Sequence, residues 1–354
     1  MAKMKKMKGE KMKRTMKRHG KIWTAAVAML VLLVVCAVQY GPFASFLTEN
    51  SIRQTGIFFE ENKMVPLAGA PDTSTEAKAL SSSPAALTAA GTVEASGIKT
   101  AEAGGAVIDY SNVDDGYVMV KYKESTETKL KVQVKGPETV YTYNLQPEKW
   151  ETFPLSDGNG TYQILVLKNI ADSRYSIKAT VSCDVKLKDA FGPYIRSNQY
   201  VNFAEAPKTV AKAASLTKKK KDPLGKVEAV YDYVVNHISY DKKKAETVKS
   251  GYLPDLDSVL KKKKGICFDY ASLMTGMLRS QGVPCKLVIG YAGTTYHAWI
   301  SVWVEGKGWI DDVIYFDGTK WKRMDPTFAS TSNRSKSVMK YIGNGKNYTA
   351  KYFY

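Results

Sequence analysis

The stretch GICFDYASLMTGMLRSQGVP, residues 265 to 284, constrains the fold of this chain more than any other segment. Its apolar residues recur at helical spacings, which predicts an amphipathic helix over residues 267 to 281. They are Tyr270, Met274, Met277 and Leu278, with Gly282 placed to end the helix and Pro284 beyond it. The stretches KLVIGY (286 to 291) and HAWISVWV (297 to 304) follow as buried strands. A helix packed on a sheet, in the α+β class, is therefore expected here.

Cys267 lies in the first turn of this expected helix. Free backbone N–H groups and the positive end of the helix dipole at that position stabilise a thiolate. The Cys267 N–H can also donate to an oxyanion, and Gly265 lets the chain turn sharply and a substrate backbone approach closely. Asp269 is expected to support the helix N-terminus rather than to take part in chemistry. The pattern suits a nucleophile.

A thiolate nucleophile also needs a base and a group that orients the base. His297 begins the second strand, and Asp325 follows the run KWKRM, with Pro326 ending that strand. Side chains at the ends of neighbouring strands can bring an imidazole to both a thiol and a carboxylate, as in cysteine acyl-transfer enzymes. A zinc site is not expected, because no CxxC motif occurs and only His237 and His297 follow the N-terminal region. No metal or other cofactor is predicted.

The segments GICFDYASLMTGMLRSQGVPCKLVIGY, YHAWISVWVEGKGWI and RMDPT together resemble the transglutaminase-like superfamily, whose fold is related to papain. The resemblance covers roughly residues 225 to 330, less than a third of the chain. It implies a nucleophile at Cys267, its base at His297 and the orienting acid at Asp325. It also makes Tyr240 and Trp299 candidates for substrate contact or the oxyanion site. The insert DDVIYFDGTKWKR before the Asp motif departs from the pattern and lengthens a hairpin.

The N-terminal region predicts export. Residues 1 to 21 hold ten of the 52 Lys and Arg, and residues 22 to 38 carry no charge, so 22 to 40 is either a signal anchor or a cleaved signal peptide. The basic tail is expected to stay in the cytoplasm and the rest to be exported. Three cysteines follow this segment, and so few do not make a disulfide framework. Two of them, Cys183 and Cys285, are expected to lie in hydrophobic cores.

Composition divides the exported part into three. Residues 41 to 106 are expected to be a linker, rich in Ala, Ser and Thr in the second half. Residues 107 to 204 alternate apolar and polar residues, as in Leu130 to Val134, Tyr141 to Leu145 and Tyr175 to Leu187, which predicts an immunoglobulin-like β-sandwich. Residues 205 to 354 form the expected transglutaminase-like catalytic domain.

The expected function is that of an exported, bacterial cell-surface cysteine enzyme acting on peptide or glutamine-type amides through a thioester, most simply a protease or deamidase. A cross-linking transglutaminase and a non-catalytic module that binds cell-wall polymers or proteins stay open as alternatives. The enzyme is expected at the cell membrane, or secreted if the segment is cleaved. The lysine runs at 218 to 221, 242 to 244 and 261 to 264 are read as solvated loops that could also attract anionic cell-wall polymers. Export and the lack of a recognition motif disfavour nucleic acid.

Overall fold

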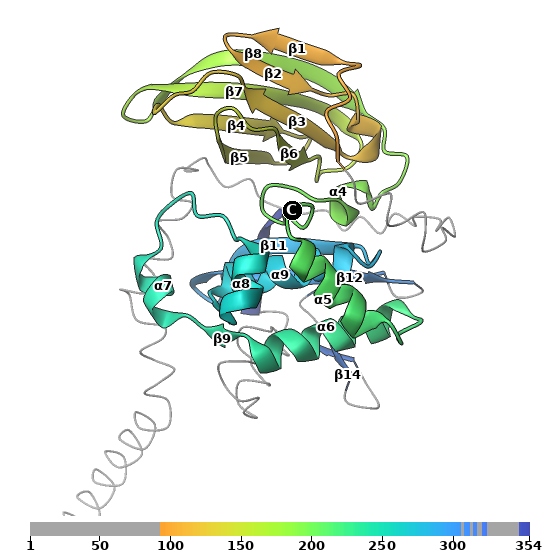
Figure 1. Cartoon of the computed structure of the whole chain (residues 1–354). Helices are drawn as coiled ribbons and strands as arrows, with labels where there is room; N and C mark the ends of the chain where they lie inside the picture. Colours follow the sequence, from red (N-terminus) through yellow and green to blue (C-terminus); the bar gives the residue numbers. More distant parts are fainter. Residues whose placement is uncertain (1–92, 306–307, 312–313, 317–320, 324–346) are drawn as a thin grey trace, which may run out of the picture. The chain divides into compact units, whose positions relative to one another are not determined.

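A computed structural model of the chain describes residues 93–305, 308–311, 314–316, 321–323 and 347–354. The expected tail, membrane segment and most of the expected linker lie outside these residues. None of the helices in the described ranges combines the length and the apolar character that crossing a membrane requires. The fold class is mixed α and β, with an all-β part followed by a part in which helices pack on a sheet (Figure 1).

Two four-stranded antiparallel sheets make up the all-β part. The first has the order β1 (Thr100–Ala103), β2 (Ala106–Asp109), β3 (Tyr117–Tyr122), β6 (Glu151–Pro154). The second has the order β5 (Val140–Leu145), β4 (Leu130–Lys135), β7 (Gly160–Ala171), β8 (Arg174–Val185). The 3-10 helix η1 (Val113–Asp115) precedes β3. Strand β8 contacts β1 and β2, and Figure 1 shows the sheets as adjacent layers.

The alternation of apolar residues correctly predicts most of this core. Leu130, Val132 and Val134 of β4 are at most 3% exposed, and Tyr141, Tyr143 and Leu145 of β5 are buried too. The sheets begin earlier than expected, because β1 and the start of β2 fall within the predicted linker. The immunoglobulin-like assignment of the two sheets stays a prediction.

Helices dominate the next part of the chain. They are α4 (Gly192–Ile195), α5 (Pro207–Thr217), α6 (Pro223–His237), α7 (Lys242–Thr247), α8 (Leu256–Lys262) and α9 (Cys267–Arg279). Between them, the short strands β9 (Ser239–Tyr240) and β10 (Lys264–Gly265) pair in parallel. Asp222, Asp241 and Asp255 each accept a hydrogen bond from a first-turn N–H and so fix the starts of α6, α7 and α8.

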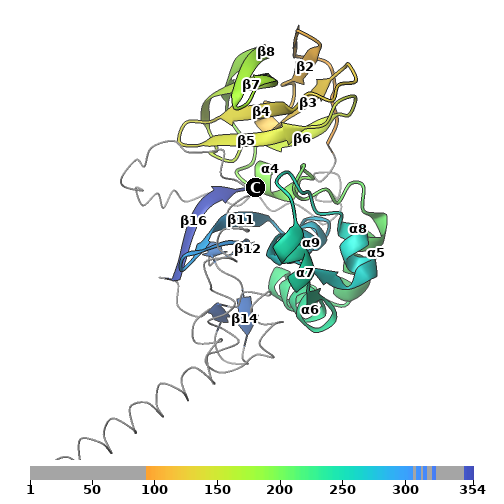
Figure 2. The ribbon, with the colours of Figure 1, turned by 90° about the vertical axis from the view of Figure 1, so that its left-hand side faces the viewer.

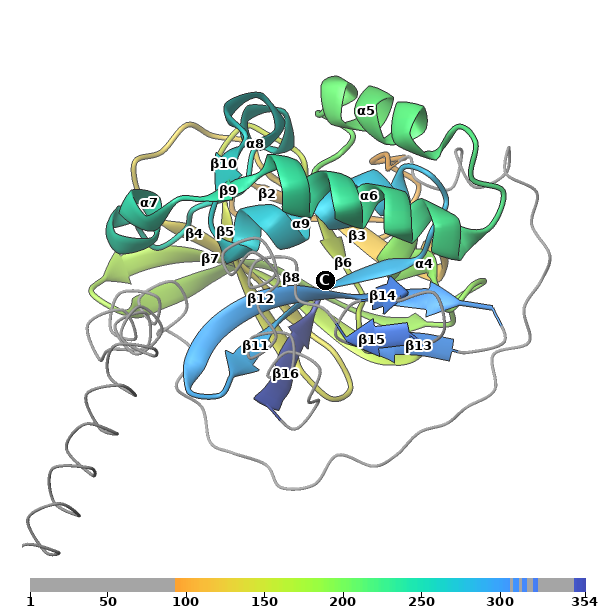
Figure 3. The ribbon, with the colours of Figure 1, turned by 90° about the horizontal axis from the view of Figure 1, so that it is seen from below.

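A second sheet region follows the helices. Four strands pair in the order β13 (Gly308–Asp311), β12 (Thr295–Val304), β11 (Cys285–Ala292), β16 (Tyr348–Phe353). The hairpin β14 (Ile314–Phe316) with β15 (Trp321–Arg323) occupies the expected insert. Helix α9 contacts β11 and β12 on one side and α5, α6 and α8 on the other (Figures 2 and 3). Packed on both sides, α9 is buried at every residue from Phe268 to Arg279, so the expected polar face is absent from it.

Candidate active site

Cys267 is the first residue of α9. The preceding residue, Ile266, is extended with φ −94° and ψ 177°, so the helix starts abruptly at the cysteine. Cys267 is partly exposed, whereas the rest of α9 is buried. The thiol is therefore within reach of a substrate, next to the unpaired N–H groups that begin a helix.

His297 lies on β12, paired with Gly290 on the neighbouring strand β11. Its side chain is 5% exposed, and its ring stacks on Trp299 with 6.2 Å between ring centroids and 20° between ring planes. A Cβ at Gly290 would lie 2.8 Å from Cη2 of Trp299 and 2.1 Å from the carbonyl oxygen of Thr349. The glycine thus makes room for the indole that supports the His297 ring.

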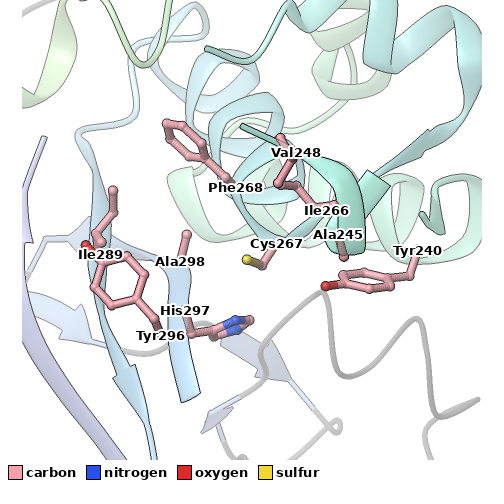
Figure 4. A pocket seen from close by; sticks show the side chains of 10 residues that line it. All are labelled: Tyr240, Ala245, Val248, Ile266, Cys267, Phe268, Ile289, Tyr296, His297 and Ala298. Carbon is pink, nitrogen blue, oxygen red and sulfur yellow. The ribbon is translucent and has the colours of Figure 1, made fainter. Parts of the chain in front are cut away.

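Cys267 and His297 line one pocket. Figure 4 shows their side chains, with that of Tyr240, facing the same space from α9, β12 and β9. The other lining residues are Ala245, Val248, Ile266, Phe268, Ile289, Tyr296 and Ala298. The wall is largely apolar, which suits an uncharged group beside the reacting bond.

Of the remaining site candidates, Tyr240 lines the pocket as expected from its motif. Parallel pairing of β9 with β10 places it opposite Gly265, and the Asp241 N–H donates to the Gly265 carbonyl oxygen at 2.9 Å. Trp299 is 2% exposed and does not belong to the described pocket lining, so its place is behind His297. Asp325 lies outside the described residues, and its role stays a prediction.

Asp269 anchors the start of α9, as expected. Its carboxylate accepts from the Ile266 N–H at 2.8 Å, from the Tyr252 hydroxyl at 2.5 Å and from the Lys244 ammonium at 2.6 Å. Asp269 is 0% exposed. Lys244 belongs to α7, whose Ala245 lines the pocket, so this cluster ties the pocket wall to the helix that carries Cys267.

Gly265 has a close contact that the sequence did not predict. A Cβ at this position would lie 2.5 Å from Cβ of Asp269. The glycine therefore lets the Asp269 carboxylate turn back onto the Ile266 N–H. The expected close approach of a substrate backbone to Gly265 stays a prediction.

The other two cysteines after the N-terminal region have environments that oppose ionisation. Cys285 is 0% exposed, and burial raises the pKa of its thiol to about 12. Burial also raises the pKa of the Cys183 thiol, with the negative charge of Asp184 adding to the effect. Neither is suited to be a nucleophile near neutral pH.

The Asp269→Asn substitution is expected to lower the free energy of unfolding by about 2–4 kcal/mol. The amide can still accept from the Ile266 N–H, but the Lys244 ammonium, 26% exposed, loses its counter-charge. Urea unfolding measures the change, and alkylation of Cys267 should slow as the helix start loosens. The control is Glu228→Gln, which breaks an exposed pair with Lys220 and should cost less than about 0.5 kcal/mol. Equal losses in the two variants would contradict the anchoring role.

Sequence reasoning missed Lys244 and Tyr252, because nothing distinguishes one lysine within a run of three or one tyrosine in a loop. It also missed Tyr296 and Ile289 as lining residues. Strict alternation along β12 would put the side chains of Tyr296 and His297 on opposite faces of the sheet. Both nevertheless border the pocket, near the first residue of the strand.

Comparisons with known proteins identify part of the chain. The family model described as the transglutaminase-like superfamily matches residues 210–311. UPF0252 protein MJ1282 of Methanocaldococcus jannaschii is 28% identical over 178 residues, which is 44% of this chain and 49% of that protein. The kyphoscoliosis peptidase of Mus musculus is 31% identical over 108 residues, which is 27% of this chain and 16% of the peptidase. The matches thus span about half or less of these relatives.

Among solved structures, the periplasmic domain of TgpA from Pseudomonas aeruginosa, bound to ethylmercury, is similar over 68% of this chain and 78% of that one. The sequence identity is 18% and the TM-score 0.30.

Proposed function

From the premise that residues 210–311 form a transglutaminase-like domain, we propose that this chain is a cysteine enzyme that cleaves or transfers peptide or glutamine-type amides. The observation that carries the proposal is the shared pocket of Cys267, at a helix start and partly exposed, and the buried His297. A nucleophile and a base facing one cavity are the minimum for covalent acyl transfer.

In the proposed mechanism, His297 takes the thiol proton and the Cys267 sulfur attacks the amide carbonyl carbon. The Cys267 N–H stabilises the oxyanion, and the Tyr240 hydroxyl is a second candidate donor because its side chain faces the pocket. The C–N bond breaks as imidazolium protonates the leaving amine, and a thioester remains. Asp325 is proposed to orient the imidazole.

Water or an amine then takes the acyl group from the thioester. With water the enzyme is a protease or deamidase, which we favour, and with a lysine amine it is a cross-linker. A non-catalytic module binding wall polymers or proteins is the remaining alternative, which the shared pocket of a thiol and an imidazole disfavours. We further propose that residues 22–40 tether the enzyme to the membrane or direct its secretion, with the domains after them outside the cell.

Mass-spectrometric profiling of a peptide mixture, with the full-length chain beside Cys267→Ala, tests the proposal. Added cadaverine serves as an amine acceptor. New peptide ends, Gln-to-Glu conversions or cadaverine adducts distinguish proteolysis, deamidation and transfer. We expect the full-length chain to produce new peptide ends or Gln-to-Glu conversions, and we expect neither with Cys267→Ala. Identical mixtures with both proteins would favour the non-catalytic module.

A further inference from the structure

Two lysine runs that lie apart in the sequence meet beside the pocket. The run 242 to 244 follows β9 and the run 261 to 264 ends in β10, and these two strands pair. The Ser239 N–H donates to the Lys263 carbonyl oxygen at 2.9 Å, which fixes the junction. We call the exposed members without an ion pair the lysine rim; they are Lys242, Lys243, Lys261, Lys262 and Lys263.

None of the rim lysines forms an ion pair with an acid in the described part of the chain. Lys244 is committed to Asp269, and Lys264 pairs with Asp241 at 3.4 Å, so neither is counted in the rim. No rim ammonium group lies within salt-bridge distance of a carboxylate among the described residues. Glu246, exposed on α7, offsets one of the positive charges.

The rim is close to the reacting thiol along the chain. Lys242 is two residues beyond Tyr240, and Lys263 is three residues before Ile266, both of which line the pocket. With at most 3.8 Å between successive Cα atoms, the rim begins within about 8–11 Å of the pocket lining. That is near the Debye length of about 8–10 Å at ordinary salt, so the field of the rim reaches a bound ligand.

Lys263 adds a second observation. It ends α8 in the left-handed region, with φ 52° and ψ 36°. Glycine or asparagine is favoured at such a helix end, and a lysine there is strained. The strained backbone therefore holds a lysine at the helix end that directly precedes β10, at the edge of the pocket.

We propose that the lysine rim selects acidic peptide segments as substrates, with the uncharged reacting residue in the apolar pocket and Asp or Glu a few residues away. This rests on the proposed function, because it assigns a substrate class to the same site. An extended peptide advances about 3.3 Å per residue, so side chains two to four positions from the reacting bond come level with the rim.

The test compares alkylation of Cys267 by iodoacetate, an anion, and by iodoacetamide, its neutral analogue, in the full-length chain with site-resolved mass spectrometry. In the rim variant, glutamine replaces all rim lysines except Lys263. The matched control replaces four exposed lysines of the α5 region, Lys208, Lys218, Lys219 and Lys221. At 10 mM salt, the iodoacetate-to-iodoacetamide rate ratio should fall about threefold to tenfold in the rim variant and stay unchanged in the control.

Raising the salt to about 0.5 M should bring the wild-type ratio down to that of the rim variant. Poly-L-glutamate should slow iodoacetate labelling of the wild type more than a glycerol-phosphate polymer does. It should not slow the labelling of the rim variant in this way. An unchanged ratio, an equal fall in the control, or protection by the phosphate polymer alone would overturn the inference. If neither reagent modifies Cys267 in the wild type, the proposed function fails instead.

Discussion

Replacing Cys267 by alanine is expected to abolish the amide-cleaving or acyl-transfer activity, with a fall of at least about 10³-fold in kcat/KM. The thiol forms the covalent bond to the substrate, so no other group in the pocket can substitute for it. The rate is measured on the best peptide from the profiling experiment. Because Cys267 is partly exposed at the helix start, its loss should leave the fold intact.

Folding is the control for this prediction. The free energy of unfolding of Cys267→Ala should stay within about 0.5 kcal/mol of wild type. Cys285→Ala should show the reverse pattern, with lower stability and retained activity, since Cys285 is 0% exposed and its thiol donates to the Thr275 hydroxyl at 3.6 Å. Retention of full activity by Cys267→Ala would refute the covalent mechanism.

Arg279→Met is expected to lower the free energy of unfolding by about 3–5 kcal/mol. The Arg279 guanidinium, 1% exposed, donates to three backbone carbonyl oxygens: those of Cys285 at 2.8 Å, Arg196 at 2.8 Å and Tyr354 at 2.5 Å. Burial lowers its pKa to about 10, so it stays charged at neutral pH. The side chain joins the end of α9 to three other segments.

Methionine fills much of the same space but offers no donor, so the loss reports the hydrogen bonds rather than a cavity. Urea unfolding gives the free energy, and Arg279→Lys, with a single ammonium, should lie between wild type and Arg279→Met. The control is Arg174→Met at the exposed start of β8, expected within about 0.5 kcal/mol of wild type. A loss below about 1 kcal/mol for Arg279→Met would show that the three carbonyl oxygens find other partners.

Local patterns predicted the elements that form the candidate site. The spacing of apolar residues located α9, and two apolar runs located β11 and β12, each to within a few residues. The first-turn position of Cys267 follows from the same pattern. These features depend on neighbours close in the sequence, and periodicity reports those neighbours well.

Features that depend on distant segments could not be predicted. In the sequence, Arg279 stands at the end of a helix, a position typical of a surface cation. Only the fold brings three carbonyl oxygens to its guanidinium. In β8, alternation would bury Ile177, yet it is 59% exposed, because Lys178 is an extra residue between the partners of Val166 and Leu167 and shifts the register of β8 against β7. Cys183 lies on the same strand, and although it was expected in the core it is only partly buried.

The most direct test of the central claim is site-resolved alkylation of the native full-length chain by iodoacetamide. Cys267 should react at least about tenfold faster than Cys183 and Cys285, and His297→Ala should slow Cys267 about tenfold or more while leaving the other two unchanged. Preferential modification of Cys183 or Cys285, or a Cys267 rate that does not respond to His297→Ala, would contradict the account of a thiol activated by this histidine.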